Sequence, residues 1–335
     1  MKSIRIILII WLFFLPEANA LKPFRAVFYN VENLFDYFDD TLKQDEEYLP
    51  GNIRGWNSSR YYSKLGHISR VVSAIGENRF PELIGLAEVE NDRCLKDLTQ
   101  KAPLKNAGYH FVHLESEDQR GVDVALLYNP YRFSPSKIQT LTPRFINEPN
   151  KKTRDVLYVK GLIDQKIELH VFVCHYPSRL GGDVESETYR RQVSVMIRAH
   201  IDSLFQKQTN ANILVMGDFN DYPEDKSIAQ DLHAVASKIN VSIANPDVLV
   251  NALPVNFKKG MNGTLKHQNS WGILDQMMFS QNLYKHISGV HVLQTDFLLQ
   301  PDVRWLGKKP FRTYSGYQYI GGYSDHLPIW VDMLF

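Results

Sequence analysis

Acids, amides and histidines stand at the ends of apolar runs in this 335-residue sequence. Such residues close, follow, precede or lie within six separate runs, and they are Asn30, Glu88, His175, Asp218, Asn220, Asp275, Asp325 and His326. Any one of them could be a turn former or a helix cap. Eight together point to a common site, because a carboxylate or amide beside buried strands is costly unless it is paired or binds a cation.

The residue types in this group favour one kind of chemistry. Strands of one sheet can bring their ends to a shared edge, where distant residues meet in a cleft. Asp, Glu and Asn oxygens suit a hard cation such as Mg²⁺ or Mn²⁺. Zinc is disfavoured because the sequence has no His-Glu-x-x-His and no Cys pair. A hard cation with histidines and an Asp fits phosphoester hydrolysis, and no Gly-x-Ser-x-Gly supports acyl transfer.

Two amphipathic helices and a series of strands must position these residues. One helix carries apolar residues at steps of three and four over 61–75 and would be capped by Ser58 or Ser59. The other carries such a face over 189–204. The expected strands are 24–31, 82–89, 122–128, 155–163, 167–174, 212–216, 273–279 and 327–331, and an acidic loop follows the first of them at 36–47.

The order of these elements predicts a layered α/β sandwich, with sheets covered by helices. Strands alternate with helices in the first half, whereas adjacent strands in the middle are typical of hairpins. No Gly-x-Gly-x-x-Gly follows a strand, which argues against a doubly wound dinucleotide-binding fold. No low-complexity linker divides the chain, so residues 21–335 are predicted to form a single catalytic domain.

The first twenty residues are typical of a secretory signal peptide. Lys2 and Arg5 precede an apolar run over 6–15, and Ala18-Asn19-Ala20 offers a cleavage site. The run is too short to cross a bilayer, so we expect a secreted or periplasmic protein without a stable membrane anchor. The two cysteines, Cys94 and Cys174, are predicted to be unpaired, with a single disulfide as the alternative.

Composition limits the class of protein. Hydrophobic residues make up 44% of the chain, which excludes a disordered protein. The 38 Lys and Arg residues nearly balance 37 Asp and Glu residues, so non-specific coating of nucleic acid is excluded. Binding of a polyanion would therefore depend on a local patch. No protein partner is evident, and a monomer is expected.

The motifs around these residues resemble those of the endonuclease/exonuclease/phosphatase superfamily, which includes pancreatic-type deoxyribonuclease and abasic-site endonucleases. They are Phe-Tyr-Asn-Val-Glu-Asn-Leu-Phe-Asp (28–36), Leu-Ala-Glu-Val-Glu (86–90), Gly-Asp-Phe-Asn (217–220), Leu-Asp (274–275) and Ser-Asp-His-Leu-Pro (324–328). Arg-Gly-Val-Asp-Val-Ala-Leu (120–126) and His-Tyr-Pro-Ser-Arg (175–179) resemble its exported bacterial branch. The motifs cover 24–335 in family order. The resemblance implies two packed mixed sheets flanked by helices, with the active site at one edge.

The resemblance also implies a metal site and the cation that it holds. Glu88 would be the principal metal ligand, helped by Asn30, and Asp325 would contribute to the same site. Oxygen ligands of this kind suit Mg²⁺, with Mn²⁺ possible.

Five residues take catalytic roles by the same resemblance. Asp218 would activate or orient the attacking water, and Asn220 would hold either the phosphate or that Asp. His326 would bond to the scissile phosphate and would be oriented by Asp275. His175 stands where relatives place a His or Tyr that touches the phosphate.

Four further residues are candidates for substrate binding: Arg120, Asp123, Arg179 and Arg190. A bidentate guanidinium suits phosphate. Arg190 could equally lie on the solvated face of its helix, and Asp123 could be a structural acid of a hairpin.

Basic and aromatic residues alternate between 301 and 323, namely Trp305, Lys308, Lys309, Arg312, Tyr314, Tyr317 and Tyr319. Such a stretch can follow a phosphate backbone and stack bases, or it can be a surface flap whose aromatics pack on the core. Lys151, Lys152 and Arg154 form a smaller basic patch in an expected loop.

Together these features predict an exported Mg²⁺-dependent phosphodiesterase that acts as a nuclease on DNA or RNA. The alternatives are a phosphatase or a phospholipid or inositol-phosphate phosphodiesterase of the same superfamily, and a non-catalytic binding module on the same fold. The intact acids and histidines speak against the binding module.

Overall fold

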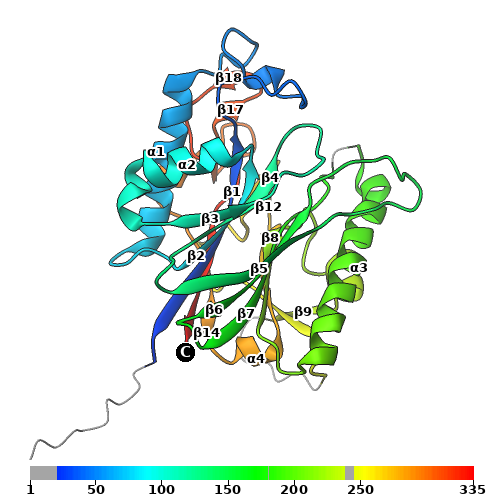
Figure 1. The fold of residues 1–335 in the computed structure, drawn as a ribbon. Helices are drawn as coiled ribbons and strands as arrows, with labels where there is room; N and C mark the ends of the chain where they lie inside the picture. Colours follow the sequence, from blue (N-terminus) through cyan, green and yellow to red (C-terminus); the bar gives the residue numbers. More distant parts are fainter. Residues whose placement is uncertain (1–20, 180, 238–244) are drawn as a thin grey trace, which may run out of the picture.

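Two mixed β-sheets pack against each other, and helices cover their outer faces (Figure 1). The computed structural model describes residues 21–179, 181–237 and 245–335. The predicted signal peptide, residues 1–20, lies outside the described residues. The arrangement confirms the predicted layered α/β sandwich. Within the described ranges, no helix has both the length and the apolar character that crossing a bilayer requires.

The first sheet has six strands in the order β14-β19-β1-β2-β4-β3. Helices α1 (Ser58–Gly76) and α2 (Asp92–Gln100) lie on its outer side, at the left of Figure 1. Its strands are β1 (Pro23–Leu34), β2 (Leu83–Val89), β3 (His110–His113), β4 (Asp123–Tyr128), β14 (Ile287–Val292) and β19 (Ile329–Leu334).

The second sheet has seven strands in the order β5-β6-β7-β8-β13-β10-β9. Helix α3 (Asp183–Lys207) covers its outer face, at the right of Figure 1. Its strands are β5 (Phe133–Leu141), β6 (Val156–Ile163), β7 (Ile167–His175), β8 (Ile213–Asp218), β9 (Ala234–Ser237), β10 (Leu249–Ala252) and β13 (Asp275–Phe279).

Strand β8 explains why the central strands are apolar throughout. Ile213 and Val215 pack in the cluster beneath α3, whereas Leu214 and Met216 pack in the core between the two sheets. Successive side chains of a strand point to opposite faces, so a strand covered on both faces needs an unbroken apolar run. Burial of the apolar side chains of β8 therefore stabilises both the packing of the two sheets and the packing of α3 on the second sheet.

Short elements lie between the strands and helices described above. The 3-10 or π segments are η1 (Glu46–Tyr48), η2 (Pro103–Ala107), η3 (Ser227–Asp231) and η4 (Asp296–Leu298), and α4 (Gln281–Tyr284) is a single helical turn. Three small hairpins complete the chain: β11 (Leu265–His267) with β12 (Ser270–Gly272), β15 (Leu299–Pro301) with β16 (Lys308–Pro310), and β17 (Tyr314–Ser315) with β18 (Gln318–Tyr319).

The expected strands are present with ends shifted by a few residues, but two details of the sequence-based prediction are wrong. Helix α1 is capped by Asn57 rather than by Ser58 or Ser59, because the Asn57 side chain accepts a hydrogen bond from the Arg60 N–H at 3.1 Å. Strands β3, β5, β9, β10 and β14 and helix α2 are among the elements that were not predicted, although the buried residues Cys94, Leu95 and Leu98 give the short helix α2 an apolar face. Cys94 and Cys174 are buried free thiols, as predicted.

The topology gathers one end of each sheet at a single place. Strands β1 and β2 are parallel neighbours, and so are β7 and β8. Strand β13 runs antiparallel to β8, and β19 runs antiparallel to β1. The carboxyl ends of β1, β2, β7 and β8 therefore meet the beginnings of β13 and β19, which is where the polar residues of the sequence lie.

Strands β7 and β8 approach each other so closely at Gly217 that no side chain fits. A Cβ atom there would lie 2.4 Å from the Cys174 carbonyl oxygen and 2.7 Å from the Cys174 Cβ. We expect Gly217→Ala to lower the free energy of unfolding by about 2 kcal/mol, because the backbone of a packed sheet cannot yield. Urea denaturation measures this loss.

The control for this change is Gly66→Ala in α1, where a Cβ would meet no atom within 4 Å. Alanine is the better helix former, so this variant should gain about 0.5–1 kcal/mol. Equal midpoints for the two variants would contradict the close approach at Gly217.

Candidate active site

Asp218 is the centre of the candidate site. It ends β8, and the sheet register sets it between His175 of β7 and Asp275 of β13. Its side chain is buried, with one oxygen, Oδ2, 3.6 Å from His326 Nε2 and 3.8 Å from His175 Nε2. The other oxygen accepts the backbone N–H of Asn220 at 3.0 Å.

Glu88 and Asn30 approach Asp218 from the first sheet. The Asn30 side-chain amide donates to Glu88 Oε1 at 3.2 Å and to Asp218 Oδ2 at 3.1 Å, so it joins the two sheets. Glu88 lies at a break in the β2 ladder and has φ 64°, in the left-handed region that disfavours a side chain. The Asn33 N–H donates to Glu88 Oε2 at 2.8 Å. Strain of this kind is typical of functional sites.

His326 is held from both of its ends. Its Nδ1 lies 2.8 Å from Asp275 Oδ2, which leaves Nε2 toward Asp218. The Ser324 hydroxyl accepts the His326 N–H at 3.0 Å and donates to the Asn30 carbonyl oxygen at 2.7 Å. The Ser-Asp-His segment is thereby tied to β1.

The electrostatics of this pair are set by burial and by close carboxylates. Burial raises the pKa of Asp218 to about 7, and the nearby Asp275 adds to this effect. Burial alone would lower the pKa of His326, but Asp275 and Asp218 outweigh it and raise that pKa well above its ordinary value. Near neutral pH the site thus contains two different groups. The carboxyl group of Asp218 can gain or lose a proton, and the imidazole of His326 carries a positive charge.

His175 has the opposite character. Burial, together with the positive charges of Arg154, Arg120 and His326, lowers the pKa of His175 well below its ordinary value. Its Nε2 lies 3.8 Å from Glu88 Oε1 as well as from Asp218. A neutral imidazole here can donate or accept one hydrogen bond without adding charge.

Asn220 and Asp325 lie at the margin of this group. Asn220, with φ 50°, directs its amide to the Tyr176 carbonyl oxygen at 3.1 Å, so its contact with Asp218 is through the backbone. Asp325 precedes His326 and forms an ion pair with Arg312, Oδ2 to Nη2, at 3.0 Å.

A network of charged side chains beside the site, of which Glu32 and Lys64 are buried, was not anticipated from the sequence. Arg312 bridges Asp325 and Glu32, and its Nε lies 3.2 Å from Glu32 Oε1. Lys64, buried in α1, donates to Thr313 Oγ1 and to the Tyr323 carbonyl oxygen, both at 2.6 Å. Lys64 lies next to Leu65 on the apolar face of α1, and this position in the sequence could have indicated that its side chain is buried.

Two groups of this network, Glu32 and Lys64, have pKa values near neutral pH. Burial, with the charge of Asp325, raises the pKa of Glu32 to about 7. Burial lowers the pKa of Lys64 to about 8. The segment that carries Arg312 and leads to His326 is therefore attached to β1 and α1 by charges that balance one another.

Arg120 and Asp123, two of the predicted substrate-binding residues, lie near this edge. Arg120 is half exposed and its Nε is 3.6 Å from Asp118 Oδ1. Asp123 is buried at the start of β4, where it accepts the Ser116 N–H at 3.1 Å and faces His113 Nε2 at 3.4 Å. Only Arg120 is open to a ligand.

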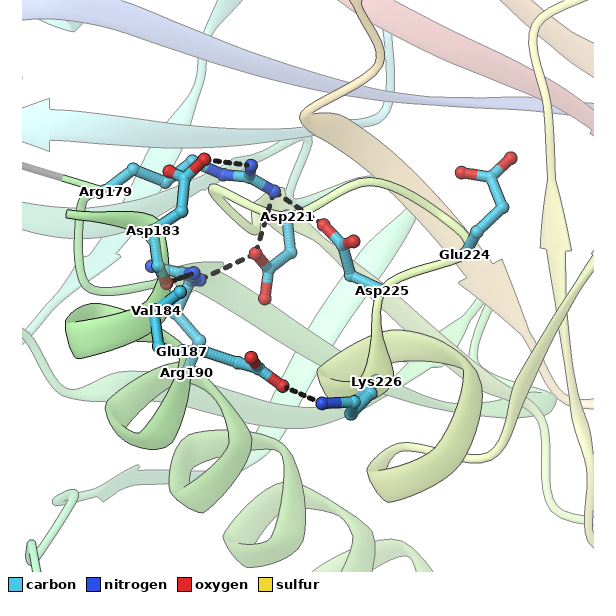
Figure 2. A pocket seen from close by; sticks show the side chains of 9 residues that line it. All are labelled: Arg179, Asp183, Val184, Glu187, Arg190, Asp221, Glu224, Asp225 and Lys226. Carbon is cyan, nitrogen blue, oxygen red and sulfur yellow. Dashed lines mark hydrogen bonds and ion pairs between the residues drawn. The ribbon is translucent and has the colours of Figure 1, made fainter.

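Arg179 and Arg190 point to a common carboxylate, as Figure 2 shows. Arg190 Nε and Arg179 Nη2 lie 2.7 Å and 3.0 Å from Asp221 Oδ1. The alternative that Arg190 lies on a solvated helix face is wrong, because its side chain is only 2% exposed. Arg179 also donates to the Asn220 carbonyl oxygen at 2.7 Å, so it supports the turn after Asp218.

The two basic stretches also differ from a simple surface patch. Tyr314 is buried, whereas Trp305 and Tyr317 are 39% and 53% exposed, so the 301–323 stretch is partly core and partly surface. Arg154 is buried, pairs with Asp118 at 3.3 Å and contacts the Tyr176 carbonyl oxygen. Arg154 therefore does not belong to an open basic loop. Its charge lies near His175 and lowers the pKa of that residue.

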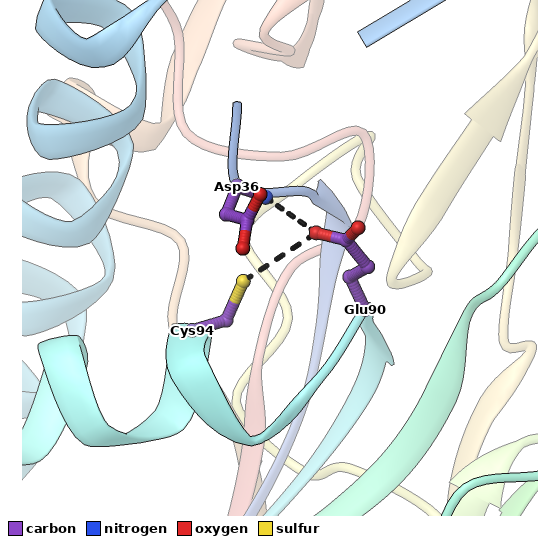
Figure 3. A group of neighbouring side chains, drawn as sticks. All are labelled: Asp36, Glu90 and Cys94. Carbon is purple, nitrogen blue, oxygen red and sulfur yellow. Dashed lines mark hydrogen bonds between the residues drawn. The ribbon is translucent and has the colours of Figure 1, made fainter. Parts of the chain in front are cut away.

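A second acidic group, Asp36, Glu90 and Cys94, lies beyond the Glu88 end of β2 (Figure 3). The Asp36 N–H donates to Glu90 Oε2 at 2.6 Å, and Cys94 Sγ lies 3.9 Å from the same oxygen. Burial, with the charge of Asp36, raises the pKa of Glu90 to about 8. The group therefore behaves as a buried acid that retains its proton.

We expect Glu90→Gln to stabilise the protein at alkaline pH. A carboxyl group whose pKa is raised in the folded state contributes stability at low pH, and that contribution is lost as pH rises from about 4.5 through 8. The variant should match the wild type at pH 5 and exceed it at pH 9 by on the order of 3 kcal/mol. Urea denaturation at both pH values, with EDTA present, measures the difference.

The exposed Glu224, which lines the pocket of Figure 2, provides the control, since Glu224→Gln should change neither value. A Glu90→Gln variant whose stability falls with pH as steeply as that of the wild type would contradict the assignment.

The donors of the candidate site fit a hard divalent cation. The carboxylates of Glu88 and Asp218 both lie within 3.2 Å of the Asn30 amide nitrogen, and burial raises the pKa of Asp218 to about 7 even though the nearby charge of His326 lowers it. The Asn30 amide oxygen accepts the Glu32 N–H at 3.0 Å and keeps a second lone pair. Carboxylate and amide oxygens of this kind are ligands for Mg²⁺ and Mn²⁺.

Comparison with solved structures identifies the same fold elsewhere. An endonuclease/exonuclease/phosphatase family protein from Bacteroides thetaiotaomicron aligns with a TM-score of 0.59 and 16% identity, over 94% of this chain and 96% of that chain. A mannosyl-6-phosphatase from the same organism aligns at 0.57 and 15%, over 93% and 100%. Truncated TDP2 from Caenorhabditis elegans aligns at 0.56 and 15%, over 93% and 98%. At such identities the likeness establishes the fold alone.

No curated protein matches the sequence. The model of the endonuclease/exonuclease/phosphatase family, however, matches residues 25–334. Proteins of this family are metal-dependent hydrolases of phosphoester bonds. Because the match extends over nearly the whole described chain, this protein belongs to the endonuclease/exonuclease/phosphatase family.

Proposed function

We propose that the protein is a Mg²⁺-dependent nuclease that hydrolyses phosphodiester bonds of DNA or RNA by attack of water. One observation carries the proposal: Asp218 faces the His326–Asp275 pair, and Glu88 and Asn30 face Asp218 from the other sheet. The residues 1–20 support export, and we propose that the protein acts as a monomer outside the cytoplasm in the exported bacterial branch of the family.

Each residue of the chain has a definite task in this reaction. Asp218, with a pKa of about 7, orients the attacking water and takes its proton. His326, charged and fixed by Asp275, donates from Nε2 to a non-bridging oxygen as negative charge develops. His175 supplies a neutral hydrogen bond to the same phosphate. Glu88 and Asn30 would hold the cation, which neutralises phosphoryl charge when it is bound.

A phosphatase for small phosphate esters is the second candidate. An ion pair of the 301–323 stretch favours it, because Lys308 pairs with Asp296 at 2.8 Å. Cations that are paired in this way attract a nucleic-acid backbone less strongly than free cations do.

A panel of phosphoesters separates the two candidates. Purified residues 21–335 should cleave plasmid DNA and a single-stranded RNA in the presence of Mg²⁺, lose that activity in EDTA and regain it when Mg²⁺ is restored. Sugar phosphates and inositol phosphates should be poor substrates. If both nucleic acids remain intact while a phosphate monoester is hydrolysed, the phosphatase is the correct assignment.

A further inference from the structure

A pocket of about 390 Å³ opens beside the candidate active site, on the side of Asp325. We call it the basic pocket. Four cationic side chains and two carboxylates line it, and the residues that matter for its chemistry are Lys266, Asp302, Arg304, Trp305, Lys309 and Asp325. None of these six residues has a role in the reaction described above.

The basic pocket is attached directly to the reacting residues. Its wall includes the β11–β12 hairpin, whose Leu265 forms an isolated β-bridge with His326. Thr264, which precedes this hairpin, accepts the Asp275 N–H through Oγ1 at 3.3 Å and the Leu327 N–H through its carbonyl oxygen at 2.7 Å. A ligand in the pocket therefore lies next to the segments that orient His326 and Asp275.

The charges of the basic pocket are not all paired. Asp302 is shared by Lys266 at 2.9 Å and Lys309 at 3.6 Å, so one carboxylate serves two cations. The Arg304 guanidinium lies over the Trp305 ring, 5.2 Å from its centroid, and within the described ranges no carboxylate lies at ion-pair distance from it. An excess positive charge thus remains for an anionic group.

The pocket also offers an aromatic surface. Trp305 is 39% exposed, in the turn between β15 and β16, and its ring is one of the pocket's walls. A base stacked on an aromatic side chain contributes about 1–3 kcal/mol to binding, and arginine adds a cation–π contribution. The guanidinium of Arg304 and the indole of Trp305 lie next to each other. Together they could bind a phosphate group and the nucleobase that follows it.

We infer that the basic pocket binds the nucleotide adjacent to the scissile bond, with its phosphate at Arg304 and Lys309 and its base on Trp305. This inference rests on the proposed nuclease function and names the substrate class more closely as an oligonucleotide strand. A phosphate monoester occupies only the reaction centre and leaves the pocket empty.

The test compares a long substrate with a short one. Trp305→Leu and Arg304→Gln should each raise KM about tenfold for single-stranded 8-mers of DNA or RNA, while kcat/KM for bis(p-nitrophenyl) phosphate stays unchanged. Arg304→Gln should also reduce the slope of log KM against log salt by about 0.7, the value for one phosphate contact on a single strand. Thermal denaturation should be unaffected, because both side chains are exposed.

Lys308→Gln is the matched control. Lys308 lies in the same hairpin but pairs with Asp296 outside the pocket, so its removal should leave KM for the 8-mers near the wild-type value. Lys309→Gln, one residue further along, should raise KM as Arg304→Gln does.

The possible outcomes distinguish a failure of this inference from a failure of the proposed nuclease function. If the wild type cleaves the 8-mers and Trp305→Leu and Arg304→Gln cleave them equally well, the pocket is not a substrate site and the nuclease assignment remains. If the wild type cleaves no oligonucleotide, both fall. If the two variants lose binding to phosphatidylcholine–phosphatidylserine vesicles but keep the wild-type KM for the 8-mers, the exposed turn binds lipid and the inference is overturned.

Discussion

Asp218→Asn is expected to lower kcat by about 10³-fold with little change in KM. The substitution keeps the size of the side chain and the acceptor for the Asn220 N–H. It removes the group that takes the proton of the attacking water, and general-base catalysis is worth about 10²–10⁴-fold. Steady-state hydrolysis of bis(p-nitrophenyl) phosphate and of an oligonucleotide, at saturating Mg²⁺, measures the loss.

Although Asp218→Asn lowers activity, it should raise the free energy of unfolding at alkaline pH. Since burial raises the pKa of Asp218 to about 7, the wild type loses stability as pH rises from about 4 through 7, and a neutral Asn avoids this loss. Without added metal, the variant should be at least as stable as the wild type at pH 8. Asp296→Asn, a change of an exposed aspartate, is the control and should alter neither activity nor stability.

His326→Gln should cost about as much activity as Asp218→Asn, and the double variant should cost little more than either. Residues that act on one transition state give non-additive losses. Activity within tenfold of the wild type in both single variants would contradict the assigned roles, whatever substrate is used.

Lys64→Met is expected to destabilise the protein by about 3 kcal/mol at pH 8. The change leaves the Tyr323 carbonyl oxygen and Thr313 Oγ1 without their buried donor, and it removes the positive charge that compensates Glu32. A buried hydrogen-bonding group that loses its partner costs about 1–3 kcal/mol, and two acceptors lose their donor here. Urea denaturation at pH 8 measures the loss.

The pH dependence identifies the cause of that loss. Glu32 has a pKa of about 7, so at pH 6 it is largely neutral and the variant should lose less stability than at pH 8. Adding Glu32→Gln to Lys64→Met should recover part of the loss at pH 8. Lys96→Met, at an exposed lysine of α2, should change stability by less than about 0.5 kcal/mol. An equal loss at both pH values would assign the effect to the lost hydrogen bonds and packing rather than to the charge of Glu32.

The sequence was informative where chemistry and strand pattern coincide. Asp218 and Glu88 each close an apolar run, and parallel pairing of β1 with β2 and of β7 with β8 brings such ends together. The motif resemblance then gave the family and the two-sheet sandwich. Local patterns of this kind survive folding, because they depend on strand periodicity and on the length of the run.

The sequence was uninformative where a residue depends on a distant partner. Lys64 follows no charge pattern, and its partners Thr313 and Tyr323 are about 250 residues away in the chain. Arg190 was as consistent with a solvated face as with a buried pair, since only the fold brings Asp221 to it. The direction of the Asn30 amide also depends on a turn that the motif alone does not specify.

The division of the site between two sheets bears on how the enzyme matures. Neither sheet alone holds a complete set of reacting groups: Asn30 and Glu88 come from one, and Asp218 and Asp275 from the other. A partly folded chain with one sheet formed would be inert, so recovery of hydrolysis during refolding would time the final docking of the layers.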